Sequence, residues 1–376
     1  MSTSTDITKR QSRLYKSILE ADLDALILNP GPSLVYMTGL HFHLSERPVV
    51  VIFTPGVNPV IVLPELEAAK VRQLDYPLKA FPYGENPATW VDAFRAAVDK
   101  AGLKQAKIGV EPRGLRFLEL DLLTKAASRA TFEAGDHVIS DLRMYKDPSE
   151  IAYMQQAADI AQSALQATLP MIKAGVTEST ISGALSMELI KQGSNPRLPF
   201  FPIVSGGPNS ANPHAAPSDR PLQEGDLLVI DYGANVGGYL SDITRTFAIG
   251  EVDPEYQKIA EIVLAANQAG REAVKPGATA GSVDHAARAV IEAEGYGEYF
   301  FHRTGHGLGL EGHEDPYILS GSDLVLKPGM TFTVEPGIYL PERNGVRIED
   351  DVLVTPEGVH TFTSLPRELV QLPLTG

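Results

Sequence analysis

The sequence contains no cysteine among its 376 residues. Disulfide bonds, thiolate metal ligands and cysteine nucleophiles are therefore excluded. No stretch approaches the roughly 18 consecutive apolar residues that a membrane-spanning helix needs, so we expect no membrane span. The opening MSTSTDITKRQSRLYK lacks the apolar centre of a secretory signal, which favours a cytoplasmic location.

Positive charge is also scarce. The chain has 32 Lys and Arg residues against 47 Asp and Glu residues, and its formal net charge is −15. Without a basic cluster, such a surface repels nucleic acid and anionic lipid, so we expect neither as a partner. Hydrophobic residues make up 43% of the chain, which is enough for a globular protein of about two domains.

Strand-like and helix-like stretches alternate over residues 1–135. The strand candidates are short apolar runs at residues 24–29, 49–54, 59–64 and 107–112. The helix candidates are residues 7–21, 64–74, 89–102 and 115–127. This alternation predicts an N-terminal α/β domain with a mixed sheet.

A linker is expected at residues 136–147, followed by a second domain at 148–376. Asp147-Pro148 with Glu150 has the pattern of a capping box that opens a helix. Two helices, an irregular stretch and a hairpin then occur twice. The predicted helices are residues 148–173, 176–193, 254–274 and 281–295. We predict an α+β domain of two similar halves, related by a pseudo-twofold axis, with both hairpins in one curved antiparallel sheet.

The first hairpin contains two aspartates, Asp231 and Asp242, in LLVIDYGANVGGYLSDITRTF. A lone Asp in such a segment is more often a solvated turn residue. If Val236 and Gly237 form a two-residue loop, however, the two aspartates face each other across the ladder. Opposed like charges destabilise a strand pair, so we expect a cation between them.

The second hairpin repeats this arrangement in TFTVEPGIYLPERNGVRIEDDVLV. With the turn centred on Glu342, Glu335 lies opposite Glu349. Strand alternation places Glu349 and Asp351 on one face of the sheet and Asp350 on the other. The pairing with Glu335 therefore selects Glu349 from the three neighbouring acids.

A histidine-rich and glycine-rich segment, HRTGHGLGLEGHEDP, lies between the two hairpins. Its glycines let the backbone approach other groups closely, and we select His306 as a ligand. A single histidine is more often structural, but the concentration of His214, His302, His306 and His313 in two flexible stretches favours a site. Glu311 and Glu314 are expected to be solvated.

Four carboxylates and one imidazole suit two divalent ions better than one. The metal ligands selected in this way are Asp231, Asp242, His306, Glu335 and Glu349. Predominantly oxygen ligands favour Mn²⁺, with Co²⁺, Fe²⁺ or Zn²⁺ as alternatives. Two such ions can activate a bridging water for amide or ester hydrolysis. Glu335 is the first candidate to shuttle its proton, and His214 and His313 can donate to the carbonyl oxygen.

The segments VIDYGANVGGYLSDITRTF, HRTGHGLGLEGHE, TFTVEPGIY and GVRIEDDVLV resemble the pita-bread metallopeptidases. This superfamily includes methionine aminopeptidase, prolidase (Xaa-Pro dipeptidase) and aminopeptidase P, and the last two are the nearest. The similarity is strong over residues 148–376. The first 135 residues resemble, less specifically, the creatinase-type N-terminal domain of the same group.

The resemblance implies hydrolysis of the Xaa-Pro bond of small peptides at a dinuclear centre, with Asp242 and Glu349 bridging. It implies that His214 and His313 act around the scissile bond. It also implies that His302 lines the proline pocket and that Arg347 contacts the substrate or orders the site. A homodimer is expected. Arg303 departs from the glycine expected there; it either binds a substrate carboxylate, which would favour dipeptides, or forms an outward salt bridge.

Three alternatives remain open from the sequence. The first is an aminopeptidase P-type release of the N-terminal residue from longer Xaa-Pro peptides. The second is metal-dependent hydrolysis of a non-peptide C–N bond by the same fold. The third is a non-catalytic pita-bread binding protein, which the complete ligand set disfavours.

Overall fold

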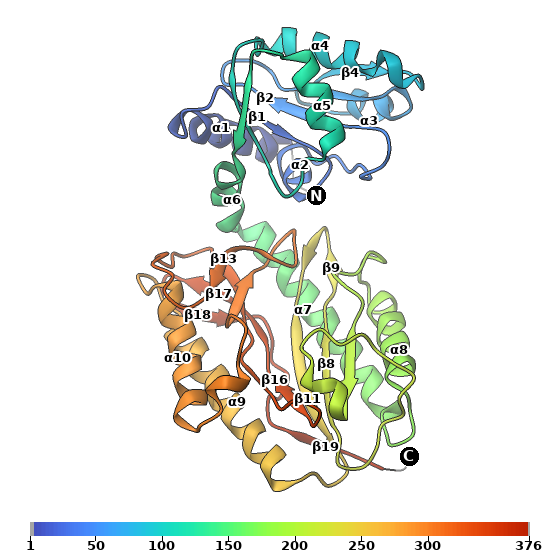
Figure 1. Ribbon diagram of the computed structural model, residues 1–376, viewed down its shortest axis with the longest axis vertical. Helices are drawn as coiled ribbons and strands as arrows, with labels where there is room; N and C mark the ends of the chain where they lie inside the picture. The colour runs from blue at the N-terminus through green and yellow to red at the C-terminus, as the bar shows by residue number, and fades with distance from the viewer. Residues whose placement is uncertain (1–3, 375–376) are drawn as a thin grey trace. The chain divides into compact units, whose positions relative to one another are not determined.

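The computed structural model describes residues 4–374 (Figure 1). The chain divides into two compact units, Met1–Arg143 and Met144–Gly376. Each unit encloses its own clusters of buried apolar side chains. Over the described residues, no helix combines the length and the apolar character needed to cross a lipid bilayer.

The N-terminal unit contains a six-stranded sheet in the order β4-β3-β2-β1-β5-β6. The strands are β1 (Ala25–Leu28), β2 (Val50–Phe53), β3 (Val60–Pro64), β4 (Lys79–Tyr83), β5 (Lys107–Val110) and β6 (Thr131–Ala134). β2 pairs antiparallel with β1 and β3, whereas the pairs β3–β4, β1–β5 and β5–β6 are parallel. The predicted α/β organisation with a mixed sheet is therefore confirmed.

Helices flank this sheet in the first unit, and the last of them ends at the boundary of that unit. They are α1 (Ser4–Glu20), α2 (Pro32–Thr38), α3 (Ala68–Arg72), α4 (Trp90–Ala101), α5 (Phe117–Ala126) and α6 (Asp136–Met144). Phe94 of α4 and Leu123 of α5 pack with Ile27 of β1 in one buried cluster. The edge strands β4 and β6 were not predicted, because few of their residues are buried and neither has the β-branched apolar run of the central strands.

The C-terminal unit repeats one order of elements. The first half contains α7 (Pro148–Thr168), α8 (Glu178–Lys191), β7 (Ile203–Gly206), β8 (Leu227–Tyr232) and β11 (Ile243–Ile249). The second half contains α9 (Pro254–Ala273), α10 (Ala280–Ala293), β12 (Gly305–Gly307), β13 (Glu314–Ile318), β14 (Thr331–Val334) and β17 (Asp350–Thr355). The predicted capping box at Asp147 and Glu150 is confirmed, since both reciprocal hydrogen bonds are present.

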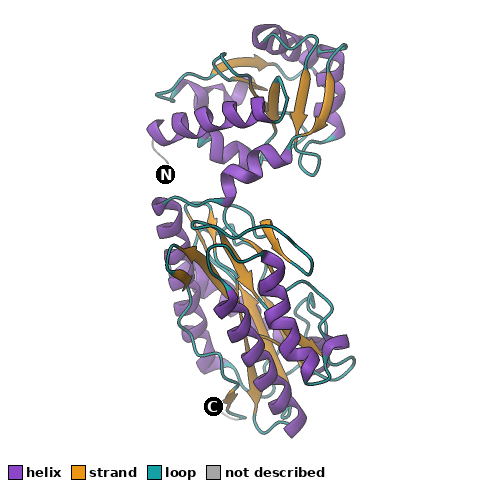
Figure 2. Ribbon diagram, turned by 90° about the vertical axis from the view of Figure 1, so that its left-hand side faces the viewer, coloured by secondary structure: helices purple, strands orange, loops and turns teal. Residues whose placement is uncertain are grey.

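The strands of the C-terminal unit form two main sheets. One has the order β19-β11-β8-β7 and the other β13-β12-β14-β17-β18, with β18 at Gly358–Thr361 and β19 at Val370–Leu372. An antiparallel bridge between Thr244 and Glu349 connects them. Figure 2 shows the helices as a layer along the strands. Helix α7, which is rich in alanine, and the Ile- and Val-rich face of α9 pack their apolar side chains against the strands.

The register predicted for the first hairpin is wrong. Asp231 of β8 lies opposite Thr244 of β11, and the two-residue loop is Gly237-Gly238, between β9 (Asn235–Val236) and β10 (Tyr239–Leu240). Both loop glycines have positive φ, 62° and 94°. A tight hairpin of this kind needs positive φ at both loop positions, which a β-branched valine resists. Asp242 therefore lies two residues from the position opposite Asp231, which preserves its side of the sheet.

The register predicted for the second hairpin is confirmed. Val334 lies opposite Asp350, and Gly337 lies opposite Arg347. The inner ladder is formed by β15 (Gly337–Tyr339) and β16 (Gly345–Arg347). The turn is centred on Glu342, which has a φ of 61°. Glu335 and Glu349 fall in the gap between the two ladders, at opposed positions.

Candidate metal centre

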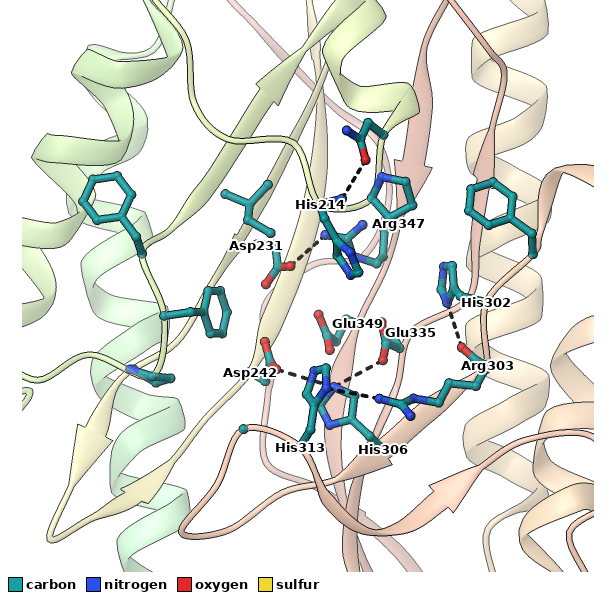
Figure 3. Close-up of a pocket in the computed structure, with 18 residues that line it drawn as sticks. His214, Asp231, Asp242, His302, Arg303, His306, His313, Glu335, Arg347 and Glu349 are labelled. Atoms are coloured by element: carbon teal, nitrogen blue, oxygen red, sulfur yellow. Dashed lines mark hydrogen bonds and ion pairs between the residues drawn. The ribbon is translucent and has the colours of Figure 1, made fainter. Parts of the chain in front are cut away.

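The C-terminal unit contains a cavity of about 880 Å³ that both of its halves line. One part of the wall is apolar and includes Phe200, Phe201, Ile203 and Phe301. The other part is polar, and Figure 3 shows the carboxylates of Asp231, Asp242, Glu335 and Glu349 and the rings of His306 and His313 around one centre, with His302 to the side. Every residue predicted as a ligand or as a contact for the substrate lies in this wall: His214, Asp231, Asp242, His302, His306, His313, Glu335, Arg347 and Glu349.

The five residues predicted as ligands are close together and almost entirely buried. One ligand atom each of Asp242, His306 and Glu349 lies within 4.8 Å of the other two. His306 Nε2 is 3.3 Å from Glu335 Oε1 and 3.8 Å from Asp242 Oδ2. The first hairpin supplies the two aspartates, and the second supplies the two glutamates. This arrangement surrounds a small space with oxygen atoms and one nitrogen.

His306 is oriented as a metal ligand would be. Its Nδ1 lies 3.1 Å from the carbonyl oxygen of Gly307, which can only accept, so Nδ1 carries the proton. Nε2 then presents its lone pair to the carboxylates. Burial, reinforced by the neighbouring His313, lowers the pKa of His306 to about 3, so the ring is neutral.

The carboxylates have too little positive charge for their burial, because among the described residues only the Arg347 guanidinium pairs with the cluster, at Asp231. Burial, followed by repulsion from neighbouring carboxylates, raises the pKa of Asp242 and of Glu349 well above the usual range. Burial likewise raises the pKa of Glu335 to about 7. No hydrogen-bond donor among the described residues reaches Asp231 Oδ1 or Asp242 Oδ1, although both atoms are buried. Orphaned anionic oxygens around a neutral imidazole fit a divalent cation.

Arg347 connects the acidic cluster to His302. Its Nη2 donates to Asp231 Oδ2 (2.7 Å), and its Nη1 donates to the Tyr339 hydroxyl (3.0 Å). That hydroxyl lies 3.0 Å from His302 Nε2, while His302 Nδ1 donates to the Arg303 carbonyl (2.7 Å). Tyr339 therefore donates to Nε2, and burial lowers the pKa of His302 to about 4. These contacts order the site around Arg347.

Thr244 links the two hairpins beside the acidic cluster. Its hydroxyl donates to Glu349 Oε2 (2.6 Å) and accepts from Arg347 Nε (3.1 Å). Thr244 was not among the predicted site residues, because the wrong register placed Asp242 opposite Asp231. Tyr339 was not predicted either, although alternation from Gly337 places it on the same side of its strand.

His214, His313 and Arg303 make different contacts at the cavity. His214 is exposed, and its backbone N–H donates to Asn212 Oδ1 (3.1 Å). His313 stacks on His306 with the ring centres 3.9 Å apart, and its Nδ1 accepts from Arg303 Nη2 (3.1 Å). The guanidinium of Arg303 also lies 4.4 Å above the ring of Tyr317.

The acids next to Glu349 and His313 are more buried than the sequence suggests. Asp351 accepts from the backbone N–H of Asp242 (2.9 Å), and Asp350 pairs with Arg245 (2.8 Å). The expectation that Glu314 is solvated is wrong. It is buried and pairs with buried Lys146 at 2.6 Å. No local pattern could predict a partner 168 positions away in the chain.

Comparisons with known proteins agree with these features. The model of "Metallopeptidase family M24" matches residues 152–356, and that of "Creatinase/Prolidase N-terminal domain" matches residues 10–145. The chain is 38% identical to "Probable dipeptidase PepE" of Mycobacterium tuberculosis, over 95% of this chain and 94% of that protein. It is 36% identical to the "Xaa-Pro dipeptidase" of Lactobacillus helveticus, over 96% and 98%. The crystal structure of dipeptidase PepE from Mycobacterium ulcerans, 33% identical, superposes with a TM-score of 0.92 and 99% coverage of both chains.

Proposed function

The chain belongs to metallopeptidase family M24, and from this premise we propose that it hydrolyses the Xaa-Pro bond of dipeptides. The observation that carries the proposal is the buried group of four carboxylates and a neutral imidazole beside an aromatic wall. Relatives that match nearly the whole chain are named dipeptidase or Xaa-Pro dipeptidase, which supports the same activity.

We assign the divalent metal ions to one set of side chains. Asp231, Asp242, His306, Glu335 and Glu349 would hold two ions. When bound, such ions polarise a carbonyl group and provide a water molecule of lowered pKa as nucleophile. The oxygen-rich ligand set favours Mn²⁺ over softer ions. Elemental analysis of protein purified without chelator tests this assignment.

The remaining roles belong to side chains of this protein. Glu335 takes a proton from the attacking water and passes it to the leaving proline nitrogen. His313 accepts from Arg303 at Nδ1, so its Nε2 carries a proton that it can donate to the substrate carbonyl oxygen. His214 assists from the exposed side of the cavity. His302, held by Tyr339, and Phe301 offer aromatic surface to the proline ring.

Arg303 favours dipeptides over longer peptides. Its guanidinium lines the cavity, and within residues 4–374 no carboxylate lies within ion-pair distance of it. The outward salt bridge considered from the sequence is therefore absent from that range. A guanidinium that contacts His313 and Tyr317 but pairs with no carboxylate in that range can bind the C-terminal carboxylate of a dipeptide. In a tripeptide that carboxylate lies one residue farther away.

A substrate panel with Mn²⁺ supplied tests the proposal. We expect turnover of Ala-Pro, little turnover of Ala-Ala, and slower turnover of Ala-Pro-Ala than of Ala-Pro. Equal rates on Ala-Pro and Ala-Ala would remove the proline preference. Faster cleavage of the tripeptide would identify an aminopeptidase P-type enzyme. Metal without turnover of any peptide would favour a non-peptide C–N hydrolase, and protein without stoichiometric metal would favour a binding protein.

The Arg303→Met variant separates the dipeptide preference from the chemistry. We expect it to raise KM for Ala-Pro and to narrow the difference between Ala-Pro and Ala-Pro-Ala. Loss of kcat without a change in KM would contradict the carboxylate role of Arg303.

Light scattering of the parent protein tests the predicted homodimer.

A further inference from the structure

The second hairpin loses its regular strand pairing at both glutamates of the candidate metal centre. β14 ends at Val334 and β15 begins at Gly337, while β16 ends at Arg347 and β17 begins at Asp350. Glu335 and Glu349 therefore lie outside the ladders that flank them. A backbone without ladder contacts needs other partners to hold a side chain in one direction.

Asn267, on the inner side of α9, supplies such a partner to both glutamates. Its side chain is fully buried, with 0% of the residue exposed. Its Nδ2 lies 3.0 Å from the carbonyl oxygen of Val334 and 3.3 Å from that of Ile348. An amide nitrogen has two protons, so it can donate to both carbonyls at once.

The two carbonyls belong to the peptide groups that contain the amide nitrogens of the glutamates. At the other end of each group, the Glu335 N–H donates to Thr304 O (2.8 Å) and the Glu349 N–H donates to Thr244 O (3.1 Å). Each peptide plane is therefore held on both sides. One side chain on a helix thus contacts the peptide groups of both glutamates.

The orientation of the Asn267 amide is itself determined by its neighbours. Its Oδ1 accepts from Arg271 Nε (2.8 Å), one turn further along α9. Arginine can only donate and carbonyl oxygens can only accept, so the opposite orientation of the amide is excluded. Arg271 Nε also lies 3.5 Å from Asp350 Oδ2, next to Glu349.

The corresponding helix of the first half carries a different contact. Gln162 of α7 is also buried, and its Oε1 accepts from the backbone N–H groups of Ser364 (2.7 Å) and Leu365 (3.1 Å). Neither residue lies in the cavity wall. Asp231 of the first half has ladder partners on both sides, Ile203 and Thr244. Asp242 lies between β10 and β11, and its N–H donates to the Asp351 carboxylate rather than binding a helix amide. Among the described residues, the helix amide that contacts the ligand backbone therefore belongs to the second half.

We propose that Asn267 is a positioning residue of the metal centre, which acts through the backbones of Glu335 and Glu349. The inference rests on the proposed metal-binding function. It predicts that the loss of the amide weakens metal binding and distorts the ligand geometry, beyond any loss of stability.

Co²⁺ titration of the intact chain tests the proposal, because the visible absorption of Co²⁺ reports both occupancy and ligand geometry. The variants are Asn267→Leu, Asn267→Asp, which keeps the acceptor for Arg271, and the matched control Gln162→Leu. We expect both Asn267 variants to bind Co²⁺ about 10–100-fold more weakly, the scale found for residues that orient metal ligands. We also expect an altered band shape at saturation. Gln162→Leu should lower Tm while its Co²⁺ affinity stays within about twofold of the parent value.

The outcomes distinguish this inference from the function on which it rests. If the parent protein binds Co²⁺ and the Asn267 variants bind it equally well with the same spectrum, the positioning role is overturned. The same holds if Gln162→Leu loses as much affinity, since the effect then follows stability. If the parent protein binds no Co²⁺, the metal centre and the positioning role both fail. Metal binding that depends on Asn267, without turnover of Ala-Pro, supports the inference and rejects the proposed substrate.

Discussion

The hairpin of β8 and β11 and the hairpin of residues 331–354 each bring two carboxylates to the same cavity, but they hold them by different means. In the first hairpin, Asp231 lies inside an unbroken strand with neighbours on both sides, while Asp242 lies just before β11 and its N–H donates to Asp351. Glu335 and Glu349 lie in breaks of their strands and are held by groups from α9 and from the first hairpin. A regular ladder orients a side chain by register alone, whereas a side chain at a break in the ladder is oriented by contacts from elsewhere in the fold.

The largest expected effect comes from the carboxylates of both hairpins. Asp242→Ala and Glu349→Ala should each reduce metal affinity and kcat by more than about 100-fold, because orienting residues alone account for about 10–100-fold. Bound metal and kcat of the two variants are measured side by side. Full activity in either variant would remove that residue from the ligand set and leave its hairpin with one carboxylate at the centre.

A smaller loss of metal affinity is expected when either of the two threonines that donate to the glutamates is replaced, and its size should differ between them. Thr244 donates to Glu349 at 2.6 Å, whereas Thr333 donates to Glu335 at 3.2 Å. Thr244→Val should weaken metal binding by about tenfold, and Thr333→Val should weaken it less because its hydrogen bond is longer. Calorimetric titration with Mn²⁺ compares the two. The reverse order would show that the contact between the hairpins is dispensable.

A smaller effect concerns the turn of the first hairpin. Gly238 has a φ of 94°, which side chains with a Cβ rarely adopt. Gly238→Ala should lower the free energy of unfolding by about 1–2 kcal/mol, the cost of a left-handed conformation for an L-residue. Urea denaturation measures this change. An unchanged midpoint would mean that the loop can shift its register.

The smallest change in the free energy of unfolding is expected at the turn of the second hairpin. Glu342 adopts a φ of 61° without being glycine. Glu342→Gly should change the free energy of unfolding by between about 0 and +1 kcal/mol, because relief of backbone strain is partly offset by the greater entropy of glycine in the unfolded chain. The sign is opposite to that expected for Gly238→Ala. A clear destabilisation would show that the carboxylate of Glu342 makes a contact that stabilises the turn.

Local patterns in the sequence account for much of the fold. The capping box at Asp147 and the alternation of elements in both units follow from near neighbours in the chain. The second register follows from a turn whose centre the Pro- and Gly-rich segment marks. The predicted register of the first hairpin is wrong by two residues, because the loop is Gly237-Gly238 and not the predicted Val236-Gly237. Because the error is an even number of residues, Asp242 still lies on the same side of the sheet as Asp231.

Local patterns suffice to predict which side chains meet at the cavity, because hairpin periodicity and a glycine-rich loop direct Asp231, Glu335, Glu349 and His306 toward it. The groups that hold these side chains come from tertiary packing. The contacts of Asn267, of Thr244 and of the Lys146–Glu314 pair join segments far apart in the chain. Hydrogen bonds of this kind depend on how helices and sheets pack, and no spacing within one segment encodes them.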